Sequence, residues 1–322
     1  MMKIVFMGTP DFASGMLKAL LLAGYPVVGV VTQPDKPKGR KKEPVYSPVK
    51  EEAISHCITV YQPKRVKDPE AIEAIRAMEP DIIIVAAFGQ IIPKEILDMP
   101  RYGCINVHAS LLPAYRGASP IQHAILDGLT TTGVTIMRMN EGLDTGDIIK
   151  ETEVPVDKKE TCGSLFDKLA GEGAKLLLAT LPEIEAGNVT YTPQPAESTT
   201  PYASMIKKSD GKIDWTRPAI EIERQVRGMN PWPSAFTVLD GKLLKIWEAH
   251  VEREEYTPGD PAETGRIVRQ DGRGLYVTCG RGILVAEEVQ MAGKKRMKTG
   301  DFLRGYVIRD NDLTRDLPGV RG

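Results

Sequence analysis

Short apolar runs recur along the first half of the chain, and each has the length of one buried strand. They fall at residues 3–7, 27–32, 81–86, 104–107 and 134–137. Between them the apolar side chains follow helical spacing, as in the segment 12–22 with Phe12, Met16 and Leu20. Buried strands that alternate with amphipathic helices are typical of α/β proteins, in which the helices connect parallel strands. The pattern therefore predicts a mainly parallel α/β domain.

The pattern changes after residue 189. Residues 190–206 lose the apolar periodicity and carry three prolines among serines and threonines. Short strand-like runs bounded by turn residues follow, at 235–239, 243–247, 265–268, 275–278 and 283–289. This spacing is typical of a small β-barrel. We therefore expect an α/β domain at 1–189, a linker at 190–206 and a β-barrel domain at 207–322.

The composition fits a globular protein of about two domains. The chain has 322 residues, of which 42% are hydrophobic, and this suffices for two cores. No apolar run approaches the length of a membrane span, and the first residues lack a signal-peptide core. The four cysteines are far apart and form no Cys-x-x-Cys pair, which indicates neither a metal site nor a disulfide. We expect a cytoplasmic protein with reduced thiols and no membrane partner.

Two local clusters of positive charge stand out against a nearly neutral chain. The whole sequence has 42 basic and 43 acidic residues, whereas residues 207–322 hold 21 basic and 18 acidic ones. The first cluster, at 36–42, has five basic residues of seven, and the second includes Lys294, Lys295 and Arg296. A charge run is often only a solvated surface, but two clusters on different domains can bind one long polyanion. Because small barrels commonly bind nucleic acid, RNA is an expected partner.

A set of polar residues suited to acyl transfer begins where an apolar strand-like run ends. Asn106 and His108 stand two residues apart, and Asp144 follows later in a glycine-rich loop. An amide and an imidazole can donate to the same oxyanion, and a carboxylate beside the imidazole fixes its tautomer. In the alternative interpretation, His108 only satisfies a loop carbonyl. Asp147 competes with Asp144 for the role of the carboxylate.

Three other features of the first half of the chain bear on alternative chemistries. Gly8-Thr9-Pro10 stands where a dinucleotide-binding protein carries its glycine-rich loop, and Pro10 in place of the second glycine argues against a nicotinamide cofactor. Cys104 lies in an apolar strand, which favours a buried structural thiol over a nucleophile. Arg116 could hold a phosphate or a carboxylate, or lie on the surface, and the spacing does not decide between these.

Several motifs together resemble the 10-formyltetrahydrofolate-dependent formyltransferase family. The resemblance rests on Asn106-Val107-His108, on Ser110-Leu111-Leu112-Pro113 followed by Arg116-Gly117, and on Leu143-Asp144-Thr145-Gly146-Asp147. Further motifs at 7–13, 32–37, 88–93 and 230–233 extend it over nearly the whole chain and narrow it to the branch that acts on methionyl-tRNA. The resemblance implies a Rossmann-like catalytic domain, followed by an OB-like β-barrel domain that helps to hold tRNA.

The resemblance also implies roles for particular residues. The catalytic residues would be Asn106, His108 and Asp144. The residues expected to bind the folate are Ser110, Leu111, Leu112, Pro113, Phe88, Gly89, Gln90 and Ile91. The residues expected to bind tRNA are Arg40, Lys41, Lys42, Lys294, Lys295 and Arg296. One departure concerns the first basic cluster, because Lys41 follows Arg40 where the family's loop has a glycine.

The implied reaction moves the formyl group of 10-formyltetrahydrofolate to the free α-amino group of initiator methionyl-tRNA. The amine attacks directly, a tetrahedral intermediate forms, and no metal takes part. The partners are therefore the tRNA and the folate co-substrate, and we expect a monomer. The alternative is a relative that formylates a small amine such as glycinamide ribonucleotide.

Overall fold

The computed structural model describes residues 1–38 and 43–314. Contacts between residues divide the chain into two compact units, and each is described by itself. The first unit comprises residues 1–120, 131–155 and 166–204, and the second comprises 121–130, 156–165 and 205–322. None of the helices in these described ranges is long and apolar enough to cross a membrane.

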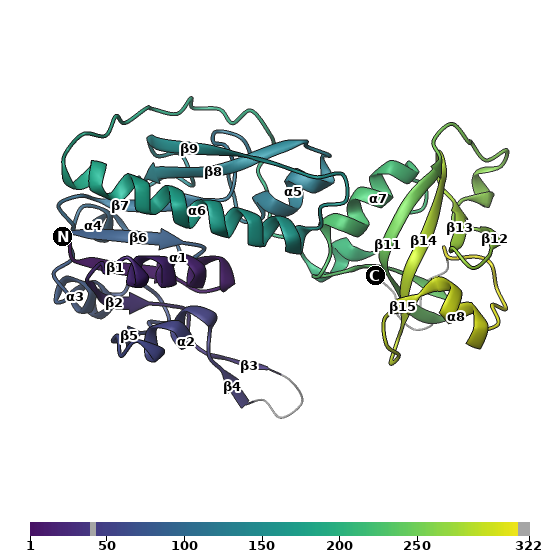
Figure 1. The fold of residues 1–322 in the computed structure, drawn as a ribbon, viewed down its shortest axis with the longest axis horizontal. Helices are drawn as coiled ribbons and strands as arrows, with labels where there is room; N and C mark the ends of the chain where they lie inside the picture. The colour runs from purple at the N-terminus through teal and green to yellow at the C-terminus, as the bar shows by residue number, and fades with distance from the viewer. Residues whose placement is uncertain (39–42, 315–322) are drawn as a thin grey trace. The chain divides into compact units, whose positions relative to one another are not determined.

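A seven-stranded sheet forms the centre of the first unit, in the order β5-β2-β1-β6-β7-β8-β9 (Figure 1). The strands are β1 Ile4–Gly8, β2 Val27–Val31, β5 Val60–Tyr61, β6 Ile82–Ala86, β7 Cys104–His108, β8 Thr131–Arg138 and β9 Ile148–Pro155. The first five in this order pair in parallel, while β8 and β9 are antiparallel. The mainly parallel α/β sheet is confirmed. The carboxyl ends of β1, β2, β6 and β7 consequently share one edge, which is where ligands collect in such sheets.

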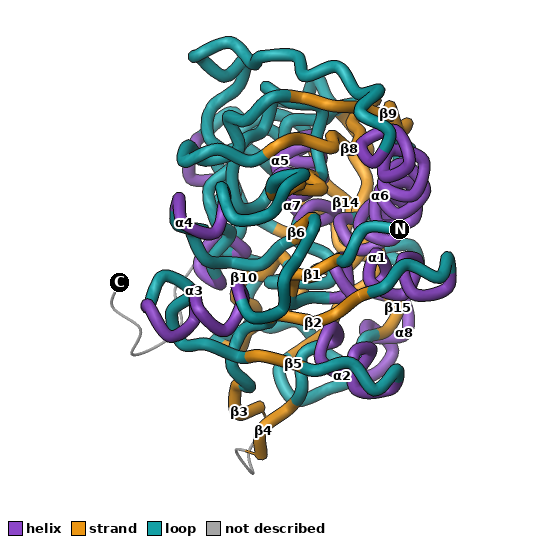
Figure 2. Tube along the Cα trace, turned by 90° about the vertical axis from the view of Figure 1, so that its left-hand side faces the viewer, coloured by secondary structure: helices purple, strands orange, loops and turns teal. Residues whose placement is uncertain are grey.

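Helices cover both faces of this sheet, as Figure 2 shows, with α1, α2 and α6 on one side and α3 and α4 on the other. They are α1 Asp11–Leu22, α2 Pro48–Ser55, α3 Pro69–Arg76, α4 Lys94–Leu97 and α6 Cys162–Glu185. Val5 and Ile83 pack with Ile75 of α3 on one face. On the other side, the rings of Phe12 in α1 and Phe166 in α6 meet edge to face, 5.7 Å apart. The strands are apolar at successive positions because both faces are covered.

The first basic cluster lies on an excursion from this sheet. β3 Lys36–Lys38 and β4 Glu43–Val45 pair in an antiparallel ladder. The residues between them, which include Arg40, Lys41 and Lys42, lie outside the described residues. The base of the excursion is described, and there Lys50 forms an ion pair with Asp35 while Gln62 donates to the same carboxylate at 2.9 Å.

The segment predicted to be a linker runs along the first unit up to Ser204. Thr192 pairs with Ile148 of β9, and Ala203 pairs with Gly117. Its polar side chains also bond to the loop after β7, since Ser198 donates to the carbonyl of Pro113 at 2.6 Å. Most of the segment is therefore held by hydrogen bonds and does not run freely through solvent.

The second unit is built on an antiparallel sheet in the order β10-β11-β14-β13-β12, with β15 paired to β14. Its strands are β10 Ala235–Leu239, β11 Lys242–Arg253, β12 Ile267–Gln270, β13 Leu275–Thr278, β14 Ile283–Met291 and β15 Met297–Lys298. Its helices are α5 Pro120–Leu126, which enters this unit at Ile121, together with α7 Ala219–Gly228, α8 Thr299–Gly305 and the 3₁₀ turns Lys208–Gly211 and Pro261–Glu263. α7 buries Ala219, Ile222 and Val226 in the core because their helical spacing puts them on one face.

The outer strands of this sheet, β10 and β12, are bridged by an irregular segment near residue 312. Ile267 of β12 donates its backbone N–H to the carbonyl of Asn311 at 2.8 Å, and Thr237 of β10 donates to the carbonyl of Leu313 at 2.7 Å. In the described part of the chain, this segment takes the place that a closing strand would occupy between the two edges.

Candidate active site

Strand β7 brings Asn106 and His108 to the edge where the carboxyl ends of the parallel strands meet. The two residues are separated by one position, so both side chains lie on the same face of the sheet. Both are buried, with 8% of Asn106 and 6% of His108 exposed. Within the described residues the side-chain amide of Asn106 has no hydrogen-bond partner. Its N–H groups are therefore available to an oxygen that enters the site.

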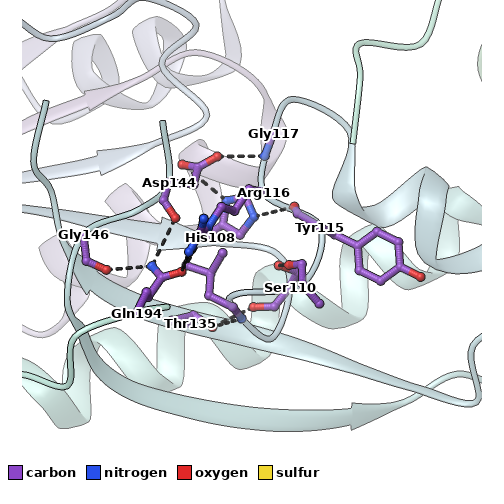
Figure 3. Close-up of polar contacts among 11 residues, drawn as sticks. His108, Ser110, Tyr115, Arg116, Gly117, Thr135, Asp144, Gly146 and Gln194 are labelled. Atoms are coloured by element: carbon purple, nitrogen blue, oxygen red, sulfur yellow. Dashed lines mark hydrogen bonds and ion pairs between the residues drawn. The ribbon is translucent and has the colours of Figure 1, made fainter. Parts of the chain in front are cut away.

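Asp144 lies beside His108, and the glycine-rich loop gives it an unusual backbone. Its φ is +53°, in the left-handed region that Asp and Asn tolerate better than most residues. The backbone N–H of Gly117 donates to Oδ2 of Asp144 at 2.9 Å, and Oδ1 lies 3.8 Å from Nδ1 of His108 (Figure 3). The competing acid, Asp147, makes no contact of this kind with His108 among the described residues. The geometry thus pairs the imidazole with Asp144.

Both ring nitrogens of His108 have neighbours. Nε2 lies 3.0 Å from the backbone carbonyl of Tyr115 (Figure 3). Because a carbonyl only accepts, Nε2 must carry the proton, which leaves Nδ1 facing the carboxylate of Asp144. The two interpretations of His108 are therefore compatible, since it satisfies a loop carbonyl and also faces an acid.

The loop that follows β7 carries half of the expected folate residues. Ser110 is buried and donates to the carbonyl of Ala114 at 2.6 Å, which closes a tight turn. The hydroxyl of Thr135, on the adjacent strand β8, donates to the carbonyl of Ser110 at 2.7 Å and accepts the N–H of Leu112 at 3.1 Å. Leu112 is buried, while Leu111 and Pro113 are half-buried. Hydrogen bonds therefore hold the turn, and Leu111 and Pro113 keep some apolar surface accessible.

The other expected folate residues follow β6 on the same edge. Phe88 is buried, Gly89 has a positive φ of 81°, and Ile91 exposes 82% of its surface. Gln90 turns toward the protein, where its Oε1 accepts the N–H of Val66 at 2.7 Å. In this arrangement Gln90 shapes the loop, whereas Ile91 offers an apolar surface to a ligand.

Two polar residues near Asp144 have roles that the sequence did not reveal. Arg116 is buried and donates to Gln194, Pro195 and Ala196, so it is neither a surface group nor free to hold a phosphate. Gln194 in turn donates to backbone carbonyls of the Asp144 loop. Gln194 lies in the proline-rich segment predicted to be a linker, where no periodic pattern marks a buried polar residue.

The thiol of Cys104 lies in β7 beneath the site. Burial raises the pKa of this thiol to about 12, and its Sγ lies 3.4 Å from the carbonyl of Ile96. A thiol with so high a pKa is not a nucleophile near neutral pH. This geometry favours the structural interpretation of Cys104.

The second basic cluster projects from the turn between β14 and β15. Lys294 and Lys295 are exposed, and no ion pair involves either of them within the described residues. Arg296 differs, because its guanidinium pairs with Glu288 at 2.6 Å and lies over the ring of Trp247 at 4.9 Å. The two lysines are therefore better placed than Arg296 to meet an external phosphate.

Comparison with known proteins identifies relatives over the full length. A family model described as formyl transferase matches residues 2–181, and one described as formyl transferase, C-terminal domain, matches residues 205–307. The methionyl-tRNA formyltransferase of Lachnospira eligens is 54% identical over 314 residues, and the match covers 95% of this chain and 98% of the relative. The methionyl-tRNA formyltransferase of Bacillus subtilis is 49% identical, over 97% of this chain and 98% of the relative.

Solved structures share the fold. The N-formyltransferase from Helicobacter canadensis, in complex with folinic acid and dTDP-3-aminofucose, matches with a TM-score of 0.62 over 90% of this chain and 100% of its own. Its sequence identity is 19%. The similarity at this level is one of architecture.

Proposed function

The chain belongs to the formyltransferase family, and within it to the methionyl-tRNA formyltransferases, and on that premise we propose that it formylates initiator methionyl-tRNA with 10-formyltetrahydrofolate. The observation that supports this most directly is the full-length similarity to methionyl-tRNA formyltransferases, together with the arrangement of Asn106, His108 and Asp144 at the strand ends. The same similarity argues against the smaller-acceptor alternative and against a nicotinamide enzyme.

In the proposed reaction, the α-amine of the methionyl group attacks the formyl carbon. A carbon–nitrogen bond forms, and negative charge gathers on the formyl oxygen. The amide of Asn106 and the Nε2–H of His108 donate to that oxygen, which requires the N–H of His108 to leave the carbonyl of Tyr115. When the bond to N10 of the folate breaks, the proton lost by the amine passes to the leaving nitrogen, while Asp144 orients His108 and assists this proton movement.

The folate fits the described residues at the same edge. Its apolar ring system would lie against Leu111 and Ile91, whose side chains are accessible, while the buried Phe88 and Leu112 support them. Tight turns hold both loops, so the pocket wall is formed before a ligand arrives. The remaining members of the expected folate set, Ser110, Pro113, Gly89 and Gln90, shape these turns.

The tRNA would contact both basic clusters, through Arg40, Lys41 and Lys42 and through Lys294, Lys295 and Arg296. We further propose that the protein acts as a monomer in the cytoplasm, where translation supplies its acceptor. A gel-filtration mass equal to twice that of one chain would contradict the monomer.

The function is tested by supplying purified protein with 10-formyltetrahydrofolate and two acceptors, charged initiator tRNA and glycinamide ribonucleotide. We expect formyl groups on the methionine of the tRNA only. In the same assay, Asn106→Ala and His108→Ala should each lower kcat by about 100-fold or more, with folate binding largely retained, because each removes one oxyanion donor. Near-normal turnover in both variants would refute their assignment, and formylation of the ribonucleotide alone would overturn the proposed acceptor.

A further inference from the structure

Asp144 is held by a set of contacts that no step of the reaction uses directly. Nε2 of Gln194 donates to the backbone carbonyl of Asp144 at 3.1 Å and to that of Gly146 at 2.6 Å. Oε1 of Gln194 accepts from Nε of Arg116 at 3.2 Å and from Nη2 at 2.9 Å (Figure 3). Guanidinium groups only donate and carbonyls only accept, so the amide of Gln194 has a single possible orientation.

These contacts form a closed ring with the loop that follows β7. Arg116 bonds to Gln194, Gln194 bonds to the backbone at Asp144, and the carboxylate of Asp144 accepts the N–H of Gly117, the next residue after Arg116. Gln194 thereby holds the backbone of Asp144, and the N–H of Gly117 holds its carboxylate. The packing around this loop also excludes any residue other than glycine at position 146, because a Cβ on Gly146 would stand 1.8 Å from the carbonyl oxygen of Arg138.

A role in stability alone explains these contacts poorly. Arg116 is only 6% exposed, and it makes no ion pair with a carboxylate among the described residues. Its partners are the neutral oxygens of Gln194, Pro195 and Ala196. Burying a guanidinium with only neutral acceptors costs free energy that an apolar side chain would not. These hydrogen bonds instead provide a fixed geometry, because the planar guanidinium of Arg116 can hold the amide of Gln194 in position.

We propose that Gln194 and Arg116 are positioning residues for formyl transfer, which act by holding Asp144 in its left-handed turn against His108. This proposal rests on the proposed role of Asp144 in the reaction. The distance of 3.8 Å between Oδ1 of Asp144 and Nδ1 of His108 is already longer than a hydrogen bond. A further displacement of the carboxylate would therefore weaken its effect on the imidazole sharply.

The test is a double-mutant cycle that joins Gln194→Leu with Asp144→Asn. Asn tolerates the positive φ and still offers an oxygen to Gly117, so this variant removes the charge and keeps the loop. We expect Asp144→Asn to lower kcat by about 100-fold or more, and Gln194→Leu to lower it by roughly 10- to 100-fold with the KM for 10-formyltetrahydrofolate nearly unchanged. The double variant should be no slower than Asp144→Asn alone, because Gln194 acts through that carboxylate.

Gln225→Leu is the matched control. Gln225 is also a buried glutamine that donates to two backbone carbonyls, those of Asp210 at 2.8 Å and Lys212 at 3.1 Å, but it lies in the second unit. Its effect on kcat, if any, should be the same in the Asp144→Asn variant as in the wild-type protein. Should Gln194→Leu fail to fold, Gln194→Glu replaces it, since Glu keeps the acceptor for Arg116 and loses the donor to the two carbonyls.

The outcomes separate the inference from the function on which it rests. Full kcat in a folded Gln194→Leu protein, or effects of Gln194→Leu and Asp144→Asn that multiply, would overturn the positioning role while leaving the function intact. Full kcat in Asp144→Asn would instead refute the proposed role of Asp144 itself, and the positioning inference with it.

Discussion

At the scale of single residues, the site depends on which atoms can donate. The carbonyl of Tyr115 requires the proton of His108 to be on Nε2, so Nδ1 gains a proton only when the ring becomes an imidazolium. Oδ1 of Asp144 lies 3.8 Å from that nitrogen and can accept its N–H when a proton is there. The pair is therefore suited to a step in which negative charge appears nearby and a proton has to be shared.

Cys104 provides a residue-scale prediction, because a thiol in the same strand could in principle compete as a nucleophile. Burial raises the pKa values of Cys104, Cys162 and Cys279 to about 12, whereas Cys57 is exposed. Only about one thousandth of a thiol with that pKa is ionised at pH 9, and the thiolate is the reactive form. With iodoacetamide at pH 8 to 9, mass spectrometry of the native protein should find Cys57 alkylated and the three buried thiols unmodified.

The matching variant is Cys104→Ala, for which we expect kcat within about twofold of the wild type, with some loss of stability from the small cavity. Cys57→Ala serves as the control for an exposed thiol. Rapid labelling of Cys104 in the folded protein, or loss of turnover in a folded Cys104→Ala variant, would show that the thiol is reactive and that its proposed structural role is wrong.

At the scale of elements, the residues proposed to be catalytic lie at the end of strand β7 and in the loop that carries Asp144. The order of apolar runs predicted the strands because each is covered on both faces and is therefore apolar at most positions. It also placed Asn106 and His108 at the end of a strand, which the structure shows as β7. The run at 235–239 likewise coincides with β10, Ala235–Leu239.

Elements stabilised by distant partners were not predictable in this way. β9, Ile148–Pro155, is an antiparallel strand with exposed polar positions, so its sequence has no continuous apolar run. Gln194 lies in a segment without regular structure, and its importance comes from Arg116, 78 positions away in the chain. A hydrogen bond over such a separation leaves no local pattern. The sequence indicated the residues proposed to contact the substrates, and it did not indicate the contacts between Arg116 and Gln194 that hold the loop of Asp144.

The base of the β3–β4 excursion gives a prediction at this scale. Asp35 accepts from Lys50, and this hydrogen bond, with a second one from Gln62, lowers the pKa of its carboxyl below the ordinary value. A carboxyl with a lowered pKa in the folded state adds stability above its unfolded pKa, and the contribution disappears as the pH falls through the folded pKa. Asp35→Asn should therefore reduce the free energy of unfolding by on the order of 1 to 3 kcal/mol at pH 7. The difference from the wild type should narrow below about pH 5.

Urea titrations at several pH values, followed by far-UV circular dichroism, measure this difference. All three tryptophans, Trp215, Trp232 and Trp247, lie in the second unit, so their fluorescence reports separately on that unit. Asp68→Asn is the control, since Asp68 is exposed and its contact with Arg65 is 3.9 Å long. A stability difference that stays constant down to about pH 3, which is below the ordinary pKa of a carboxyl group, would mean that the charge of Asp35 contributes nothing.

At the scale of the whole molecule, the residues proposed for donor binding and catalysis all lie in the first unit, whereas those proposed for the tRNA come from both units. The geometry around His108 lies within the first unit, and the N-formyltransferase from Helicobacter canadensis shares the fold. On the proposed assignment, the residues that contact the tRNA acceptor therefore lie outside the Asn106, His108 and Asp144 group. Selection of the tRNA by these residues is expected to be electrostatic, because tRNA presents phosphates over a large surface.

Salt dependence tests that expectation. Each phosphate contact that is removed should weaken tRNA binding and reduce the slope of log K against log salt by about 1. We expect this reduction for Arg40→Ala and about twice this reduction for Lys294→Ala combined with Lys295→Ala, and the reductions should add when all three substitutions are joined.

Arg296 is left intact because its loss would also free the carboxylate of Glu288. Lys175→Ala, at an exposed lysine paired with Glu172, is the control and should leave the slope unchanged. An unchanged slope in Arg40→Ala would exclude a phosphate contact by Arg40, and an unchanged slope in the lysine variant would remove the second unit's cluster from tRNA binding.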